Sequence, residues 1–196
     1  KSKKDIYLKN LDNYWTIEEK WDIIVPDDYP TIQQAVDIAG PEVGYRIFVK
    51  AGIYKENIVI KTDGIILHGE NRSITIIDGN FKKDVVSLTS KYCAVSNFTL
   101  INSGNGFSGI SLIQTSGNIF RDNRVIKNYN GISISVYSHS NNITNNNISD
   151  NYANGIIITD ICSGNEIQQN IISNNSKNGI YFDEVTSSPG TVGTFT

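Results

Sequence analysis

The chain has 196 residues, of which 39% are hydrophobic and 19% charged, with a formal net charge of −3. A small negative net charge does not predict binding to nucleic acid. No apolar run approaches the roughly 20 residues of a membrane span. The 32 isoleucines, 24 asparagines and absence of methionine put the apolar mass into stiff side chains that suit stacked strands. We expect one domain and no cofactor.

Residues 1–25 carry aromatic side chains among charges without a clear period, including Tyr7, Trp15 and Trp21. No helical or strand periodicity runs through this stretch. We interpret it as an N-terminal extension that packs on the side or end of the fold.

A short helix is predicted over about 31–39. Thr31 and Gln34 form a capping box, apolar side chains recur on one helical face, and Gly40 ends the helix. The first coil of a solenoid has an open apolar end that a terminal element must cover. Because the rest of the chain predicts a solenoid, we interpret this helix as its cap.

Three segments follow one another between residues 26 and 79 in the order PDDYPTIQQAVDIA, IFVKAGIYKENIVI and GIILHGENRSITIIDG. This order resembles the start of right-handed parallel β-helix proteins of the pectin-lyase-like class. Pectin methylesterases open in this way, and so do repeat surface proteins that resemble the periplasmic NosD family, also described as carbohydrate-binding and sugar-hydrolysis domains. The asparagine-rich repeats further along favour the second group. The resemblance covers about residues 24–183 and implies the fold.

The catalytic motifs of these families do not carry over to this sequence. Pectin methylesterases use an Asp-Phe-Ile-Phe-Gly stretch, polygalacturonases use Gly-His-Gly, and alginate epimerases use Asp-Pro-His-Asp, and all three are missing here. The partial echoes of polygalacturonase motifs are residues 124–127 and the pair Asp27 and Asp28. The resemblance therefore implies the scaffold and not the reaction, and we assign no catalytic residue.

Three copies of one pattern begin at Gly109, Gly131 and Gly155, and a fourth begins at Gly179. The period is 22, 24 and 24 residues, and self-similarity at a fixed period of this size indicates a solenoid. Each copy offers short β-branched runs separated by Asn, Ser and Gly, which predict strands with polar corners rather than helices.

Equivalent positions of the repeats form columns of like residues. The apolar columns are Phe120, Ile143, Ile167 and Val125, Ile148, Ile172, and the asparagine columns are Asn123, Asn146, Asn170 and Asn128, Asn151, Asn175. Parallel strands stacked about 4.8 Å apart would bring like side chains together, with asparagines bonded from coil to coil as ladders. The predicted fold is an all-β, single-stranded right-handed parallel β-helix at residues 26–186, followed by a tail at 187–196.

Four Asn-Gly pairs give the rival local signal, because Asn-Gly favours two-residue hairpin turns. They lie at residues 105–106, 130–131, 154–155 and 178–179. Antiparallel hairpins would not explain why the columns recur one full repeat apart. We therefore interpret the pairs as corners where Asn or Gly takes a positive φ.

The two cysteines are predicted to be separate thiols. Cys93 and Cys162 lie three coils apart, or roughly 14 Å at the strand spacing. A disulfide needs α-carbons within about 7 Å. Each cysteine is expected to pack as a small hydrophobic residue.

An acidic edge is predicted near the end of the repeats. Stacking from the glycines brings Asp160 and Glu184 about 5 Å apart on adjacent coils, with Asp183 beside them. Such carboxylates could share a proton, hold Ca²⁺ or act as a retaining glycosidase pair. The alternative is a solvated acidic edge.

Tyr137 and His139 are further ligand-binding candidates, one coil before Asp160 and Cys162. A copper or zinc site can be drawn from His139, Cys162 and a carboxylate. With one histidine the ligand set is too thin for a stable site, so we predict no metal.

Five Asn-x-Ser/Thr sequons begin at Asn71, Asn97, Asn142, Asn147 and Asn174. Asparagines in buried ladders cannot accept a glycan, whereas a corner asparagine can. Asn71 is therefore the predicted glycosylation site.

No amphipathic helix follows Phe182 to cover the last coil, so we expect continuation into another domain or end-to-end self-association through that coil. The predicted function is a noncatalytic extracellular or cell-surface module, with the periplasm as an alternative location and a structural or glycan-binding role. The alternative function is a polysaccharide-acting lyase, hydrolase or esterase with an unrecognised carboxylate site.

Overall fold

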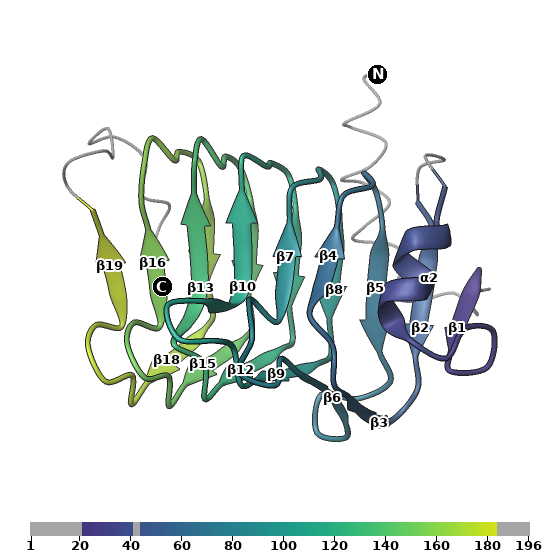
Figure 1. Cartoon of the computed structure of the whole chain (residues 1–196). Coiled ribbons are helices and arrows are strands. Elements are labelled where there is room, and N and C mark those ends of the chain that lie inside the picture. The colour runs from purple at the N-terminus through teal and green to yellow at the C-terminus, as the bar shows by residue number, and fades with distance from the viewer. Residues whose placement is uncertain (1–20, 41–43, 184–196) are drawn as a thin grey trace, which may run out of the picture.

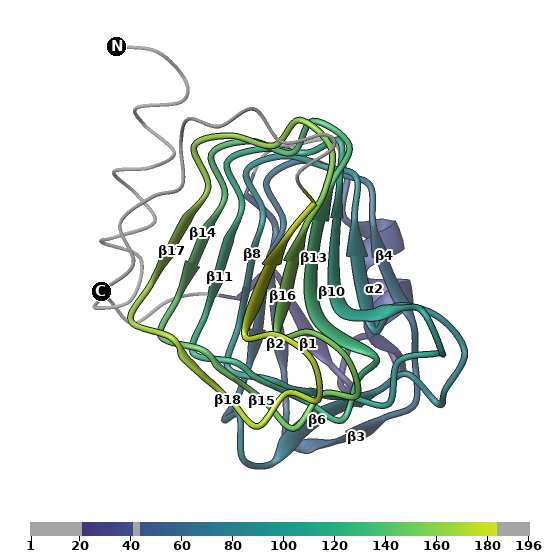
Figure 2. The same ribbon diagram turned by 90° about the vertical axis from the view of Figure 1, so that its left-hand side faces the viewer.

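The computed structural model describes residues 21–40 and 44–183. Within them the chain forms a right-handed parallel β-helix of about seven coils. Each full coil contributes one strand to each of three parallel sheets, here called A, B and C, which form the sides of the solenoid (Figures 1 and 2). The predicted fold class is confirmed.

The strands recur in the order A, B, C along the chain. Sheet A contains β1 (Ile23–Val25), β2 (Arg46–Val49), β5 (Ile66–Gly69), β8 (Ala94–Ser96), β11 (Ile119–Arg121), β14 (Asn142–Thr144) and β17 (Glu166–Gln168). Sheet B contains β3 (Gly52–Tyr54), β6 (Thr75–Asp78), β9 (Thr99–Ile101), β12 (Arg124–Ile126), β15 (Asn147–Ser149) and β18 (Ile171–Ser173). Sheet C contains β4 (Ile58–Ile60), β7 (Val86–Leu88), β10 (Ser108–Ile113), β13 (Asn130–Ser135), β16 (Ile156–Ile158) and β19 (Ile180–Phe182).

Inward-facing columns of apolar side chains from the three sheets fill the solenoid. The column of sheet A is Ile47, Leu67, Val95, Phe120, Ile143 and Ile167. In sheet C, Ile132 pairs with Ile156, and both side chains are fully buried. The predicted apolar columns are confirmed, and the fold buries them because alternate strand residues face inward.

From Tyr92 onward, a two-residue unit turns the chain at each corner. Its first residue has a left-handed backbone, and its second is buried or half-buried and is asparagine from Asn118 onward. The Oδ1 atom of each such asparagine accepts the backbone N–H of its counterpart one coil earlier, as between Asn146 and Asn123 at 3.0 Å and between Asn151 and Asn128 at 3.0 Å. The predicted ladders are confirmed, and they satisfy backbone amides that the corner removes from the sheets.

The prediction of positive φ at the Asn-Gly pairs is wrong at three of the four pairs. Gly106 has a φ of +81°, but Gly131, Gly155 and Gly179 are not left-handed. Asn130 and Gly131 instead begin β13. A Cβ atom at Gly131 would lie 2.4 Å from the carbonyl oxygen of Gly155, so close approach of adjacent coils requires glycine there.

Helix α2 (Ile32–Ile38) caps the first coils, as predicted for about 31–39. The Thr31 hydroxyl accepts the N–H of Gln34 at 3.2 Å. The carboxylate of Glu56 accepts the N–H groups of Ile32 and Gln33 at 3.0 and 2.9 Å, so a residue of the next coil completes the N-cap. The Gln33 side chain accepts the N–H of Val59 at 2.8 Å, which ties the helix to β4 at the edge of sheet C.

Strand β1 pairs with β2, so the solenoid begins within the range 1–25 interpreted above as an extension. Cys93 and Cys162 are free, which confirms two separate thiols. No helix in the described part of the chain is long and apolar enough to cross a membrane. The predictions on Glu184, the tail and the contact through the last coil fall on or involve residues 184–196, outside the described residues.

Candidate functional site

A groove lies at the corner where the chain passes from sheet C to sheet A. Tyr92, Gly117, Ser140 and Gly164 occupy equivalent positions on four successive coils, as the register of the following strands shows. All four have a left-handed backbone, with φ of 58°, 70°, 52° and 63°. Two glycines and a serine leave little side-chain volume in this column, and the surface there encloses about 470 Å³.

Tyr92 forms one wall of the groove. A Cβ atom added to Gly117 would lie 2.7 Å from Cδ1 of the Tyr92 ring. The ring therefore lies directly over Gly117, and the glycine is required both by its positive φ and by the ring above it. An aromatic face is thus held in place beside the hollow.

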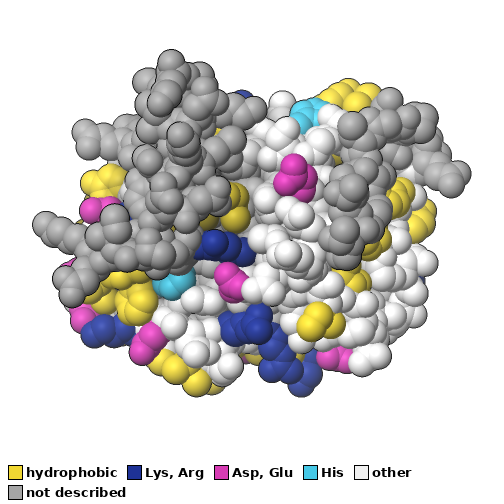
Figure 3. Space-filling view, turned by 180° about the vertical axis from the view of Figure 1, so that it is seen from behind, with side chains coloured by type: hydrophobic (Ala, Val, Ile, Leu, Met, Phe, Trp, Pro, Cys, Tyr) yellow, Lys and Arg dark blue, Asp and Glu magenta, His cyan; other side chains and the backbone are white. Residues whose placement is uncertain are grey.

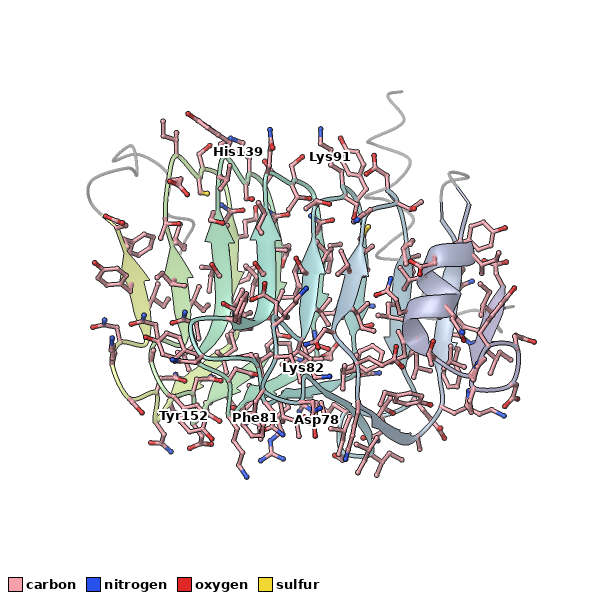
Figure 4. All side chains as sticks on the ribbon, in the orientation of Figure 1. Asp78, Phe81, Lys82, Lys91, His139 and Tyr152 are labelled. Carbon is pink, nitrogen blue, oxygen red and sulfur yellow. The ribbon has the colours of Figure 1, made fainter. Side chains whose placement is uncertain are left out.

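His139 lines the same groove, and Figure 4 shows it on the same side of the solenoid as Lys91, which directly precedes Tyr92. The Ser163 backbone N–H donates to Nδ1 of His139 at 3.0 Å, and the Ser163 hydroxyl lies 2.8 Å from the same nitrogen. Because a backbone N–H can only donate, Nδ1 is an acceptor and the neutral ring carries its proton on Nε2.

Glu166 and Asn142 supply the polar groups on the sheet A side of the groove. They are register partners on β17 and β14, and the Asn142 amide lies 3.4 Å from the Glu166 carboxylate. The Oδ1 atom of Asn142 is buried and has no hydrogen-bond partner among the described residues. The groove thus combines an aromatic ring, an imidazole, a carboxylate and an amide, a mixture typical of sites that bind polar ligands.

The candidates predicted from sequence separate in the structure. His139 lines the groove, whereas Tyr137 is exposed outside its lining. The Asp160 carboxylate accepts the backbone N–H of Val136 on the preceding coil at 3.1 Å. Asp183 follows Phe182, the register partner of Ile158, so it lies diagonally to Asp160 across adjacent coils. The pairing of Asp160 with Glu184 remains a prediction.

Tyr92, Asn142 and Glu166 were not predicted from the sequence as groove residues. A signal for the groove was present, because Gly117, Ser140 and Gly164 each precede a ladder asparagine at one-repeat spacing. The same alignment places Tyr92 at the head of that column. Small residues in a corner column thus predict a hollow.

Apart from the groove, an aromatic cluster lies on the outer face of sheet A. The Trp21 and His68 rings stack with centroids 5.3 Å apart, and the Arg46 guanidinium lies 4.8 Å from the Trp21 ring centroid. Burial, followed by the charge of Arg121, lowers the pKa of His68 from 6.5 to about 4. His68 is therefore neutral at neutral pH and acts in packing.

A family model for NosD, described as a periplasmic copper-binding protein, matches residues 37–189. The chain belongs to the NosD family. Three solved structures share the fold. Pectin methylesterase from carrot has a TM-score of 0.59 and 16% identity over 81% of this chain and 56% of its own, and a pectin methylesterase mutant in complex with a hexasaccharide has a TM-score of 0.61 and 13% identity over 77% and 56%. Alginate lyase from Paenibacillus has a TM-score of 0.52 and 15% identity over 70% of this chain and 62% of its own.

Curated relatives from Arabidopsis thaliana match about half of this NosD-family chain. Putative pectinesterase/pectinesterase inhibitor 38 is 36% identical over 114 residues, which are 52% of the chain and 23% of the relative. Probable pectinesterase/pectinesterase inhibitor 6 is 37% identical over 110 residues, which are 50% and 19%. The chain therefore spans less than a quarter of these relatives.

These matches correct the prediction of a noncatalytic module. The curated relatives carry the names of pectinesterases, which are enzymes, and the structural neighbours include pectin methylesterases. The alternative stated above, a polysaccharide-acting enzyme, is the interpretation that the comparisons support. The error arose because missing catalytic motifs were taken as evidence against any catalysis.

The copper in the family description does not fit the described residues, which contain no group of three His, Cys, Asp or Glu side chains able to hold a metal. The His68 ring nitrogens lie 2.8 Å from the Ser96 hydroxyl and 3.3 Å from the Asn97 amide, so both are engaged. Burial raises the pKa of the Cys93 and Cys162 thiols, although copper binds the thiolate.

Proposed function

We propose that this chain is part of a polysaccharide-acting enzyme and that the groove at the C–A corner binds the sugar chain. The observation that carries the proposal is the groove of about 470 Å³ beside the Tyr92 ring, with His139 and Glu166 in its lining. The pectinesterase names of the curated relatives support a polysaccharide as substrate.

The shape of the groove suits a polymer. Its column of small residues crosses three coils, or about 10 Å along the solenoid axis at the strand spacing, which is comparable with a short oligosaccharide. A tyrosine face packs against the apolar face of a sugar ring. Asparagine, histidine and glutamate side chains provide the directional hydrogen bonds that fix sugar hydroxyl groups.

His139 and Glu166 are the groups that we propose for proton transfer. The His139 ring, with Nδ1 held by Ser163, can donate from Nε2 to a leaving or hydroxyl oxygen. The Glu166 carboxylate can accept a proton from water or from the sugar. Such a pair supplies both roles of general acid–base catalysis.

The test is an assay of three products on pectin, polygalacturonate and alginate. Methanol release measures esterase activity, new reducing ends measure hydrolase activity, and unsaturated uronates measure lyase activity. We expect turnover of at least one polymer, with rates roughly 100-fold lower in His139→Ala and Glu166→Gln, which is the low end for loss of a general acid or base.

Two sets of variants serve as controls. Glu70→Gln changes an exposed carboxylate on another coil, so its rate should equal that of the wild type. Asp160→Asn and Asp183→Asn test the acidic edge predicted from sequence. Loss of activity in these two variants with normal rates in His139→Ala and Glu166→Gln would contradict the groove assignment, and no turnover of any polymer would contradict the enzyme.

We also propose that the protein acts outside the cytoplasm. The NosD family is described as periplasmic, and a polymeric substrate is met there. Fractionation of the source cells, with detection by antibody, tests this location, and recovery in the cytoplasm alone would contradict it.

A further inference from the structure

The five sequons differ in how the fold presents their asparagines. Asn142 and Asn147 lie within β14 and β15, each between two neighbouring strands. Both have a buried Oδ1 atom. The Nδ2 atom of Asn97 lies 3.3 Å from Nε2 of His68. An oligosaccharyltransferase cannot draw these three asparagines into a turn without opening the sheets or the aromatic cluster around His68.

Asn174 is exposed but its sequon is pinned by the solenoid. Its neighbour Asn175 lies in a ladder and accepts the N–H of Asn151 at 3.1 Å. The N–H of Ser176, the third residue of the sequon, donates to the carbonyl of Asn151 at 2.9 Å. Ser176 therefore cannot fold back towards Asn174.

Asn71 is presented differently, in the turn between β5 and β6. Residues 70–74 are all exposed. The Oδ1 atom of Asn71 accepts the N–H of Ser73 at 2.8 Å, and the Asn71 carbonyl accepts the N–H groups of Ile74 and Thr75 at 3.0 and 2.8 Å. These bonds close a turn in which the sequon's first and third residues meet.

The geometry points to Asn71 as a site of N-linked glycosylation. With Oδ1 engaged by Ser73, the Nδ2 atom faces no hydrogen-bond partner among the described residues. In the transfer, Nδ2 forms a bond to the anomeric carbon of a lipid-pyrophosphate-linked oligosaccharide. The bond from that carbon to the phosphate oxygen breaks, the lipid pyrophosphate leaves with the electron pair, and Nδ2 loses one proton.

A glycan at Asn71 would leave the proposed function intact. Asn71 lies between β5 and β6, at the A–B corner, whereas the groove lies at the C–A corner. The glycan would project from a turn that contributes no side chain to the groove or the ladders. The inference therefore stands apart from the proposed enzyme activity.

The test treats the folded chain with an oligosaccharyltransferase that accepts folded proteins and with its lipid-linked donor. Intact mass spectrometry should show one added glycan, and peptide mapping should place it on Asn71. Asn71→Gln and Ser73→Ala should abolish the addition, while Ser73→Thr and Asn174→Gln should retain it.

A synthetic peptide spanning residues 68–76 is the positive control for enzyme and donor. An unmodified folded chain beside a modified peptide would overturn the inference, and so would a glycan that persists in Asn71→Gln. Equal melting temperatures of the variants and the wild type keep the result independent of folding.

Discussion

The two halves of the solenoid satisfy their corner amides with different side chains. In the first half the acceptors include carboxylates on a neighbouring coil, namely Asp22, Asp63, Glu70 and Asp84, at 2.7 to 2.9 Å from backbone nitrogens. In the second half most acceptors are ladder asparagines, as between Asn146 and Asn123, and Asp160, which accepts the N–H of Val136, is an exception. One backbone requirement thus has two chemical solutions.

The difference explains why only the second half repeats. A carboxylate accepts but cannot donate, and burying its charge is costly. An asparagine side chain both accepts and donates, so one asparagine can bond to the next through any number of coils without charge. Figure 3 shows several Lys and Arg side chains close together at the lower centre of the rear face, and few charged side chains on the described surface to their right.

The largest effect is expected from a break in a ladder. In Asn146→Ala, the Asn123 N–H loses its acceptor and the Phe120 carbonyl loses its donor, both inside the solenoid. Each buried unsatisfied group costs about 1–3 kcal/mol, so we expect the free energy of unfolding to fall by about 4 kcal/mol in urea titration.

Glu70→Ala is the matched control in the first half. It removes the acceptor of the Ala51 N–H, which is 2.7 Å away at an exposed position. Water can replace the carboxylate there, so we expect a loss of less than about 1 kcal/mol. Equal losses in the two variants would remove the distinction between the halves.

The next effect is a loss of stability in acid that arises from His68 in the first half. The pKa of His68 is about 4 in the folded chain against 6.5 normally. As pH falls from 6.5 towards 4, the His68 side chain binds a proton in the unfolded chain but not in the folded chain, so the free energy of unfolding falls. A shift of this size, at about 1.4 kcal/mol per unit and reduced by solvent screening, predicts a loss of roughly 2 kcal/mol.

His68→Gln should flatten this part of the pH profile in chemical denaturation between pH 7 and 4. A variant whose stability falls as steeply as that of the wild type would show that His68 is not the group responsible.

A smaller effect is expected at the cap. Glu56→Ala frees the N–H groups of Ile32 and Gln33 at the start of α2, which should cost about 1.5 kcal/mol, within the range for lost helix caps. Glu56→Gln keeps one acceptor and should lose less. Thermal unfolding followed by circular dichroism measures both, and equal stability in all three proteins would contradict the role of Glu56.

The smallest effect is a gain in stability on replacement of Asp84. Burial raises the pKa of Asp84 above its usual 3.8, so the folded chain binds a proton more readily than the unfolded chain, and stability falls as pH rises through that window. Asp84→Asn keeps an oxygen for the Ser108 N–H, 2.7 Å away in the wild type. Its melting temperature should rise at pH 7, with the gain vanishing in acid; a lower value at pH 7 would count against the account.

The sequence predicted the fold well because stacking makes like residues recur at one-repeat spacing. The columns of Phe120 and Val125 and the asparagine ladders followed directly from that spacing. The Asn-Gly pairs misled, because Gly131 is required by the approach of the Gly155 carbonyl, a contact between coils that the local dipeptide does not encode.

The groove was predicted only in part. His139 was singled out for its chemistry, but its partner was sought at Cys162 and not at Ser163, which holds Nδ1. Glu166 was passed over because a single carboxylate in a polar strand carries no pattern of its own. The hollow arises because Gly117 and Gly164 have no side chains. A site formed by glycines is harder to predict from sequence than one formed by side chains with recognisable chemistry.

The most direct test of the central claim is a titration of the ¹⁵N-labelled chain with an oligogalacturonate, followed by NMR. If the C–A corner binds the sugar chain, the largest shifts should appear at the amides of Gly117, Ser140 and Gly164. Shifts confined to Thr159, Asp160 and their neighbours, or no shifts at saturating oligosaccharide, would contradict the account.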